Sequence, residues 1–325
     1  MPPASQTKLL FLLSAAIVVI GIATGVRVER AMQQAPAPSI IVMPADRSAA
    51  KPVAIAPLSD EVVPAQYVPA VIPPVPAPVT THDQITARAY VVGNALTGHV
   101  YISSHDKMVL PVASMSKLIT TLTATDTMSP TTTVTITPEE TDVPPDGSDL
   151  RVGETFILSE LLYPMLLDSS NVAAEAIASS SDRAKFLYLM SSYAWEIGMP
   201  TAFFADPSGL SPENVASADD MLALARYLYT YRPDILALTR TPHLVLATTT
   251  DHGSHEVDSI HPFVSDPRFI GGKTGRTPEA GETMMTILRI GSQPIVFVVM
   301  GSDYGMRQAD TDLLIQRFED LKSRD

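Results

Sequence analysis

Hydrophobic residues in the middle of the chain recur at every third or fourth position, which is the period of an amphipathic helix. Helices are predicted at Leu158–Leu167, Asn171–Ser179, Arg183–Ile197 and Ala218–Tyr229, and a further helix is predicted to begin at Ser114. The same spacing returns at the end of the sequence, over Arg307–Leu321. The central part of the chain is therefore predicted to be mainly helical.

Short hydrophobic runs rich in β-branched residues flank these helices on both sides, which is typical of strands. They are Ala87–Asn94, His99–Ser104, Thr133–Thr137, His243–Thr248, Arg268–Gly275, Thr283–Ile290 and Ile295–Gly301. Strands at both ends with helices between them predict an α+β domain whose sheet is interrupted by a helical subdomain.

The first 80 residues follow neither pattern. Leu9–Val26 is an uncharged run of 18 residues, which just reaches the length of a membrane-spanning helix and exceeds the usual apolar core of a secretory signal. Residues 1–32 are therefore predicted to be a cytoplasmic stub and membrane anchor, with a signal peptide cleaved near Ala23–Gly25 as the alternative. Residues 33–80 hold eleven of the 28 prolines and no glycine, which predicts an extended linker. Residues 81–325 are predicted to form the folded domain, outside the cytoplasm.

Composition removes several classes of function. The net charge is −13 and no stretch is rich in lysine and arginine, so a nucleic-acid partner is excluded. The chain has no cysteine, which excludes disulfides, thiolate metal sites and a cysteine nucleophile, and leaves the redox compartment open.

A serine and a lysine stand three residues apart at the start of a predicted helix, as Ser114 and Lys117. Residues three apart share one face of a helix, so the amine can reach the hydroxyl. A neutral lysine can remove the hydroxyl proton and make the serine a nucleophile. A serine at this position is equally an ordinary helix N-cap, and the pair alone does not decide between the two readings.

Two further stretches bear on that choice. Ser169 and Asn171 stand at the start of another predicted helix, where either could also be a cap. Lys273, Thr274 and Gly275 end a predicted strand, and they offer a cation, a hydroxyl and a position where a ligand can approach the backbone.

The order and separation of these three motifs, Ser-x-x-Lys, Ser-x-Asn and Lys-Thr-Gly, form the signature of serine enzymes that recognise penicillin. The second motif follows the first by 55 positions, and the third lies 104 beyond it. With the segments around them, from Ala87 to Leu321, the chain resembles the low-molecular-mass penicillin-binding proteins, in particular the D-alanyl-D-alanine carboxypeptidases. The resemblance implies a β-lactamase-like fold, with an antiparallel sheet flanked by helices and an inserted all-helical subdomain, over residues 81–325.

The resemblance also implies a role for each motif residue. Ser114 would attack the carbonyl between the two D-alanines that end a peptidoglycan stem peptide. Lys117 would take its proton, kept neutral in part by the charge of Lys273. Ser169 would relay a proton to the leaving amine, and Asn171 would orient the substrate or the lysine.

Binding of the substrate falls to the third motif in this resemblance. Lys273 and Thr274 would hold the terminal carboxylate, and Gly275 would leave room for the substrate. The backbone N–H groups of Ser114 and Arg276 would form the oxyanion hole. Water would then hydrolyse the acyl-enzyme, and neither a metal nor a cofactor is implied. Arg307 falls where relatives carry an arginine, so it would bind a carboxylate or form a surface salt bridge.

The implied partners are the stem peptide, β-lactam inhibitors and the membrane, with the catalytic domain on the outer side; the oligomeric state stays open. Three functions stay in view: the carboxypeptidase, an enzymatic variant that cuts crosslinks or β-lactams, and a non-catalytic sensor. A Glu-x-x-Leu-Asn stretch, which would favour a class A β-lactamase, is absent.

A few residues depart from the family or stand outside its motifs. His261 replaces a common asparagine, and Val172 replaces an aspartate. His252 and His255, with two nearby acids, make a metal site conceivable, but a polar hairpin tip is the better interpretation because no third ligand motif accompanies them. Ser208 is interpreted as a turn residue.

Overall fold

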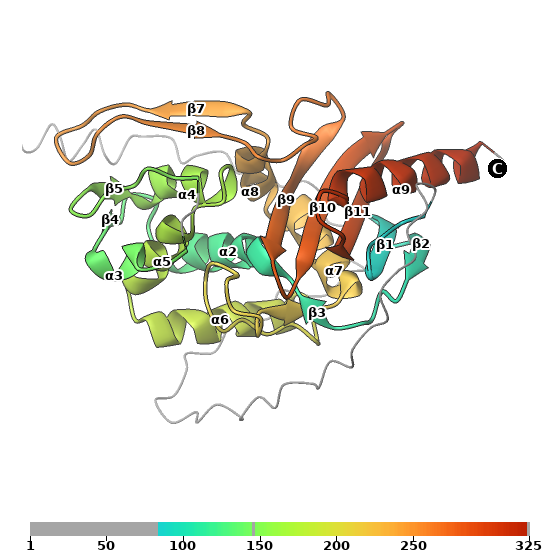
Figure 1. Cartoon of the computed structure of the whole chain (residues 1–325), viewed down its shortest axis with the longest axis horizontal. Coiled ribbons are helices and arrows are strands. Elements are labelled where there is room, and N and C mark those ends of the chain that lie inside the picture. Colours follow the sequence, from blue (N-terminus) through green and yellow to red (C-terminus); the bar gives the residue numbers. More distant parts are fainter. Residues whose placement is uncertain (1–83, 145–146, 324–325) are drawn as a thin grey trace, which may run out of the picture. The chain divides into compact units, whose positions relative to one another are not determined.

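A five-stranded antiparallel sheet brings the two ends of the described chain together. The computed structural model describes residues 84–144 and 147–323. The strands lie in the order β2-β1-β11-β10-β9 and all neighbours are antiparallel (Figure 1). Their bounds are β1 Ala89–Asn94, β2 Val100–Ser104, β9 Phe269–Thr277, β10 Gly281–Ile290 and β11 Gln293–Ser302. Since β1 pairs with β11, the predicted interruption of one sheet by helices is confirmed.

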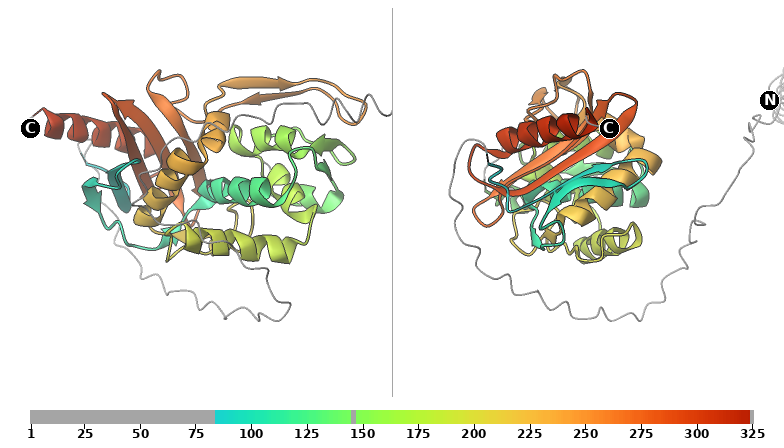
Figure 2. Two further views of the ribbon diagram at one scale, coloured as in Figure 1. Left: turned by 180° about the vertical axis from the view of Figure 1, so that it is seen from behind. Right: turned by 90° about the vertical axis from the view of Figure 1, so that its right-hand side faces the viewer.

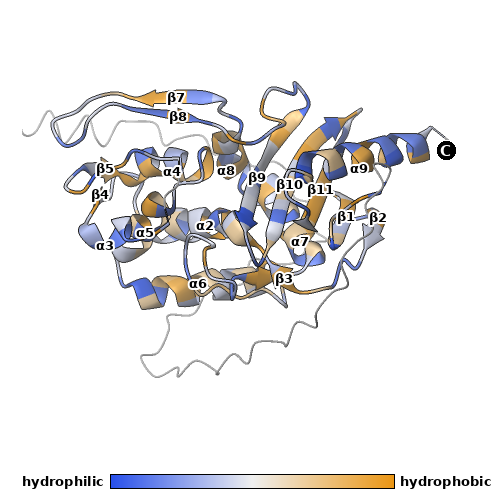
Figure 3. Ribbon diagram, in the orientation of Figure 1, coloured by the Kyte–Doolittle hydropathy of each residue, from blue (hydrophilic) through white to orange (hydrophobic). Residues whose placement is uncertain are grey.

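Helices cover both faces of this sheet, as the side view in Figure 2 shows. On one face, Phe297 of β11 packs in a hydrophobic cluster with Leu314 and Phe318 of α9, which spans Arg307–Lys322. On the other face, the alternate residues of β11 join the main core, which they share with the helical part. Because β11 is buried on both faces, its sequence is a continuous hydrophobic run rather than an alternation, and Figure 3 shows it as an orange strand.

The helical part stands between β2 and β9 in the sequence. Its helices are the 3₁₀ turn η1 Ala113–Ser116, α2 Lys117–Thr127, α3 Pro138–Thr141, α4 Leu158–Leu166, α5 Asn171–Ser179, α6 Arg183–Glu196, α7 Ala218–Tyr231 and α8 Pro233–Thr239. The hydrophobic spacing predicted α4 to α7 to within two residues at each end. It did not reveal α3 and α8, which are too short to repeat the spacing and begin instead at Pro138 and Pro233, where proline is pre-set for the first helical turn.

Serine caps fix the start of two of these helices. Ser170 accepts a hydrogen bond from the backbone N–H of Ala173 (3.1 Å), and Ser217 accepts one from the N–H of Asp220 (3.1 Å). Each bond satisfies one of the N–H groups that a helix leaves without a partner at its start. The first cap is important for the site because it makes Asn171 the first residue of α5.

Three short antiparallel pairs complete the fold. They are β3 Leu110–Pro111 with β6 Val215–Ala216, β4 Thr133–Thr135 with β5 Thr155–Ile157, and β7 His243–Leu246 with β8 His255–Asp258. The sequence predicted β4 and β7 but not the other four strands. The β7–β8 hairpin extends over α4 and β5 (Figure 1), where the N–H of Thr155 donates to the carbonyl of Asp251 (3.0 Å).

The predicted anchor at residues 1–32 and the predicted linker at 33–80 lie outside the described residues. Within residues 84–144 and 147–323, none of the helices has both the length and the apolar character needed to cross a bilayer.

Candidate active site

Ser114 lies in a tight 3₁₀ turn and does not cap a helix. The turn begins at Ala113, whose φ of +49° places it in the left-handed region. The cap positions of η1 and α2 are held by Val112 and Ser116, and neither makes a side-chain cap bond. The cap reading of Ser114 is therefore wrong. Its Oγ is instead directed to Lys117 and to a backbone carbonyl.

Lys117 is fully buried and its amine lies within hydrogen-bond distance of three oxygen atoms. These are Ser114 Oγ at 2.9 Å, Asn171 Oδ1 at 2.8 Å and the carbonyl oxygen of Ser208 at 2.6 Å. Two of the three are carbonyl oxygens, which can only accept. A neutral amine that donates its two N–H groups to them is left with its lone pair facing Ser114 Oγ. This is the geometry that a general base for the serine needs.

Ser169 of the second motif is hydrogen-bonded to Lys273 of the third. Ser169 has a φ of +72°, in the left-handed region, and directly precedes Ser170, the N-cap of α5. The Ser169 Oγ accepts a hydrogen bond from Lys273 Nζ (2.8 Å), and the same amine donates to the carbonyl of Thr274 (3.0 Å). Two residues that are 104 positions apart in the sequence are thereby joined directly.

Lys273 is a buried cation whose charge is disfavoured where it lies. Burial lowers its pKa well below the ordinary value. A proton on Lys117 and the charge of Arg307 lower it further, whereas Asp168 opposes them. The two lysines are therefore close enough for their charges to interact, as the resemblance implied.

Gly275 lets β9 lie directly against the nucleophile turn. A Cβ at this position would be 2.8 Å from the backbone nitrogen of Ser114 and 2.9 Å from the Cβ of Ala113. No side chain fits there, so the strand that carries Lys273 borders the Ser114 N–H. The residue that follows, Arg276, carries the other N–H of the predicted oxyanion hole on the same strand.

Arg307 and Arg276 extend the positive end of the site. Arg307 is the first residue of α9, and its guanidinium donates to the carbonyl of Gly275 (3.2 Å). Burial lowers its pKa, Glu282 raises it and Arg276 lowers it. Arg276 is exposed, with its guanidinium carbon 5.1 Å from the ring centre of Tyr304. In the described part of the chain, neither guanidinium lies within ion-pair distance of a carboxylate, which leaves both available to a carboxylate of a ligand.

The structure thus brings the predicted residues together, with Thr274 buried beside Lys273. Sequence reasoning missed Ser208, which had been interpreted as a turn residue. Its carbonyl is the acceptor closest to the Lys117 amine. A backbone carbonyl carries no signature in the residue type, and the one available signal was Gly209, which follows it at a φ of +87°.

His261 is buried against the Lys-Thr-Gly strand, where a Cβ on Gly272 would lie 2.7 Å from its Nε2. Its Nδ1 accepts from the N–H of Phe263 (3.3 Å), which leaves Nε2–H to donate to the carbonyl of Met285 (3.2 Å). Burial lowers its pKa to about 3, with smaller contributions from Lys273 and Arg307. The ring is therefore neutral and holds its loop against β10.

The two histidines of the β7–β8 hairpin are structural. The predicted hairpin is present, and the rings of both histidines are buried in it. His255 lies between Asp149 Oδ1 (2.5 Å from Nδ1) and Glu154 Oε1 (3.0 Å from Nε2), and His252 stacks on Phe156 with ring centres 4.3 Å apart. Across the described residues, no three histidine or acidic side chains form a group that could hold a metal ion.

Comparison with known proteins points to one family. A family model described as D-alanyl-D-alanine carboxypeptidase matches residues 77–304. A D-alanyl-D-alanine endopeptidase of Haemophilus influenzae is 31% identical over 209 residues, which cover 62% of this chain and 70% of that protein.

Solved structures agree with this match. The D-alanyl-D-alanine carboxypeptidase of Mycobacterium tuberculosis superposes with a TM-score of 0.66 at 21% identity, covering 75% of this chain and 93% of that one. Penicillin-binding protein D2 of Listeria monocytogenes, solved in its cefotaxime-bound form, superposes with a TM-score of 0.63 at 25% identity and covers 72% and 97%. The fold predicted by the resemblance is therefore confirmed.

Proposed function

The chain belongs to the D-alanyl-D-alanine carboxypeptidase family of serine hydrolases, and from this premise we propose that Ser114 is its nucleophile and Lys117 the base that activates it. The observation that carries the proposal is the 2.9 Å contact between Lys117 Nζ and Ser114 Oγ, with two carbonyl oxygens taking the other directions of the amine. The substrate is the D-alanyl-D-alanine end of a peptidoglycan stem peptide.

Acylation begins when Lys117 takes the proton of Ser114 and Oγ bonds to the carbonyl carbon of the penultimate D-alanine. The backbone N–H groups of Ser114 and Arg276 hold the oxygen that becomes negative. The C–N bond then breaks, and the proton that Lys117 took passes through Ser169 to the leaving amine, so the lysine is neutral again. The Ser169 hydroxyl accepts from Lys273 Nζ at 2.8 Å, so it is oriented to pass its own proton on.

Recognition of the substrate falls to the positive end of the site. Lys273, Thr274 and Arg307 hold the terminal carboxylate, which offsets the repulsion among the buried cations. Once D-alanine leaves, a water molecule takes its place, gives a proton to Lys117 and attacks the ester carbon. The C–O bond to Ser114 breaks, and the hydroxyl regains its proton from the lysine.

Cleavage of crosslinks is the alternative that one observation favours. The relative from Haemophilus influenzae carries the name endopeptidase. A crosslink bond differs from the bond that a carboxypeptidase cuts only in the group attached to the leaving nitrogen. Arg276 is exposed beside Gly275, where the larger leaving group of a crosslink would extend.

A β-lactam is expected to acylate the same serine. Its strained amide would meet Ser114 as the peptide does, and its carboxylate would meet the same cations. The cefotaxime-bound structure of the Listeria protein supports this expectation.

The location of the enzyme is proposed from the sequence alone. The uncharged run Leu9–Val26 would anchor the chain in the cell membrane, and residues 33–80 would hold the catalytic domain on the outer side. Carbonate extraction of membranes that contain the full chain tests this, because an anchored protein stays in the pellet. Recovery in the supernatant at the size of a shortened chain would favour a cleaved signal instead.

The catalytic proposal is tested with the full-length chain and two substrates, a stem pentapeptide and a crosslinked dimer. Release of D-alanine from the pentapeptide is expected, and Ser114→Ala should lose it entirely. Ser116→Ala is the matched control two residues along, since its buried Oγ has no hydrogen-bond partner among the described residues. If Ser114→Ala still releases D-alanine, the assignment of Ser114 as the nucleophile is wrong. If the parent chain cleaves the dimer faster than the pentapeptide, the endopeptidase is favoured.

A further inference from the structure

A glycine brings the 206–209 segment against the nucleophile turn. Gly209 has a φ of +87°, and a Cβ there would be 2.1 Å from the carbonyl oxygen of Ala113 and 2.6 Å from Ser116 Oγ. No other residue fits, so the backbone of this segment lies as close to the turn as packing allows.

One face of α2 then meets two consecutive carbonyls of that segment. Lys117 Nζ donates to the carbonyl of Ser208 (2.6 Å), and Thr120, one turn later, donates to the carbonyl of Pro207 (2.6 Å). Residues three apart share a helix face, which accounts for the match to adjacent peptide groups. The position of the Ser208 carbonyl therefore decides how the Lys117 amine is oriented.

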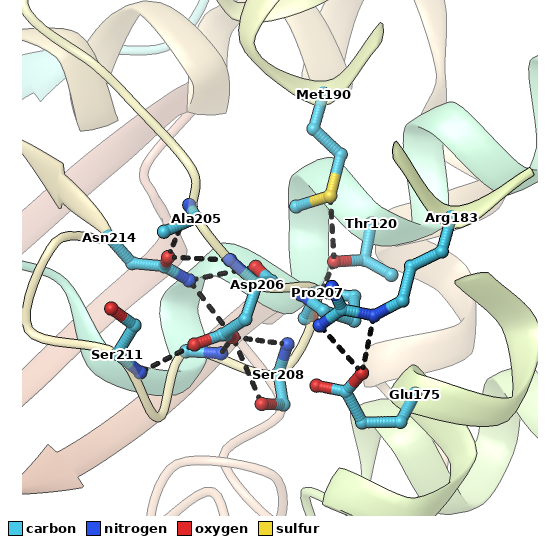
Figure 4. Close-up of polar contacts among 11 residues, drawn as sticks. Thr120, Glu175, Arg183, Met190, Ala205, Asp206, Pro207, Ser208, Ser211 and Asn214 are labelled. Atoms are coloured by element: carbon cyan, nitrogen blue, oxygen red, sulfur yellow. Dashed lines mark hydrogen bonds and ion pairs between the residues drawn. The ribbon is translucent and has the colours of Figure 1, made fainter. Parts of the chain in front are cut away.

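The side chain of Asp206 holds this segment from the opposite side. Figure 4 shows its carboxylate among the groups that it binds. Oδ1 accepts from the backbone N–H groups of Ser208 (2.8 Å) and Gly209 (2.6 Å) and from the Asn214 amide (3.2 Å). Oδ2 accepts from the N–H of Ser211 (2.5 Å). A carboxylate with this many donors is fixed in place, and its exposed fraction is 9%.

Asn214 ties the same carboxylate to the strand that leads to Ser114. Its Oδ1 accepts from the N–H groups of Ala205 (2.8 Å) and Asp206 (3.1 Å). Its backbone carbonyl accepts from the N–H of Val112 (2.9 Å). Asp206 is thus positioned relative to the nucleophile turn and not only within its own loop.

The bond to Gly209 sets the direction of the Ser208 carbonyl. In a trans peptide the C=O and the N–H of one planar unit point in opposite directions. Because the Gly209 N–H points at Asp206, the Ser208 carbonyl of the same unit points away from Asp206, toward Lys117. Without the carboxylate, this peptide unit could rotate, and the Ser208 carbonyl would lose its hydrogen bond with Lys117 Nζ.

We propose that Asp206 is a positioning residue for the proton transfer at Ser114. Its carboxylate orients the Ser208–Gly209 peptide, the Ser208 carbonyl takes one N–H of Lys117, and the lone pair of the amine is left facing Ser114 Oγ. The proposal rests on the function of Lys117 as the base. It assigns Asp206 no contact with the substrate, so it predicts an effect on the chemical step and none on initial binding.

Acylation of the full-length chain by a fluorescent penicillin, followed over a range of concentrations, tests this proposal. The saturating rate constant and the dissociation constant of the complex before acylation are obtained separately. Asp206→Ala is expected to lose about 100-fold in the rate constant, the effect of a misplaced catalytic group, with the dissociation constant unchanged within about threefold. Asp206→Asn keeps an oxygen for the Gly209 N–H and is expected to recover all but about fivefold of the rate.

Asp220→Ala is the matched control, because Asp220 is also buried and accepts a backbone N–H, that of Ser217 (2.9 Å), without contacting Ser208. It should lower the unfolding temperature and leave the acylation rate unchanged. If Asp206→Ala does not fold, Asp206→Glu displaces the carboxylate by one methylene and should lose about tenfold or more. The proposal would be overturned if Asp206→Ala or Asp206→Glu acylated at the rate of the parent chain. It would also be overturned if the loss appeared in the dissociation constant and not in the rate constant. Failure of the parent chain to acylate would instead contradict the proposed function.

Discussion

Two buried nitrogen-bearing side chains, those of Lys273 and His255, differ in what surrounds them. Lys273 donates to a hydroxyl and a carbonyl, and burial together with neighbouring positive charges lowers its pKa. His255 lies between two carboxylates, those of Asp149 and Glu154. Burial raises the pKa of Glu154, but hydrogen bonds from Gly253 and Arg151 and the charge of His255 outweigh it and leave that pKa lowered.

The difference distinguishes the proposed binding site from a structural contact. A buried cation without a carboxylate partner destabilises the folded chain until a ligand supplies the negative charge. A buried histidine between carboxylates has its partners already and gains nothing from a ligand. The charge balance of a cluster, more than its burial, indicates which of the two binds substrate.

Replacing Lys273 is expected to give the largest effect. Lys273→Met should raise KM for a D-alanyl-D-alanine peptide about 10- to 100-fold, because the carboxylate loses a cation. The same variant should be about 1–2 kcal/mol more stable at pH 7, because the uncompensated charge is gone. Peptide kinetics and denaturant unfolding measure the two effects.

Lys107→Met is the control for that variant, since Lys107 is exposed. It should leave KM unchanged and change the free energy of unfolding by less than about 0.5 kcal/mol. The distinction between Lys273 and His255 would be wrong if Lys273→Met were less stable than the parent chain and bound the peptide equally well.

Replacing His255 should do the reverse. His255→Gln is expected to cost about 1–3 kcal/mol of stability, because it leaves Asp149 and Glu154 without their shared donor, and to leave the kinetics of the folded enzyme unchanged. His243→Gln is the matched control on the same hairpin, where the Asp258 pair (2.8 Å) is more than half exposed and should contribute less than about 1 kcal/mol. Equal losses in both variants would contradict the structural role of burial here.

At pH 7 the smallest effect is expected at His261, because this effect develops only as the pH falls. The folded pKa of about 3 lies below the ordinary 6.5, so between these values the unfolded chain binds the proton and the folded chain does not. Stability therefore falls as pH drops through this window, by about 1.4 kcal/mol per unit from this residue. His261→Asn carries no titrating group and should reduce the slope by that amount. Unfolding curves of both chains, measured from pH 4 to 6.5, give this slope. An unchanged slope in His261→Asn would mean that the ring is already charged in the folded parent chain.

The sequence predicted most of the sheet and the central helices because these are long enough to repeat a period. It also predicted Ser114, Lys117, Ser169 and Lys273, because each motif names its chemistry through the side chain. What it missed depends on the backbone or on long separations in the sequence. The carbonyl of Ser208 has no residue signature, and nothing near His255 announces a partner at Asp149, 106 positions away.

The central claim is that Ser114 is the residue that becomes acylated. The most direct test is to incubate the full-length chain with a penicillin, measure the intact mass, and locate the adduct by peptide mapping. The account predicts one adduct, on the peptide that contains Ser114, and none in Ser114→Ala. An adduct on another residue, or no adduct on a folded chain, would contradict it.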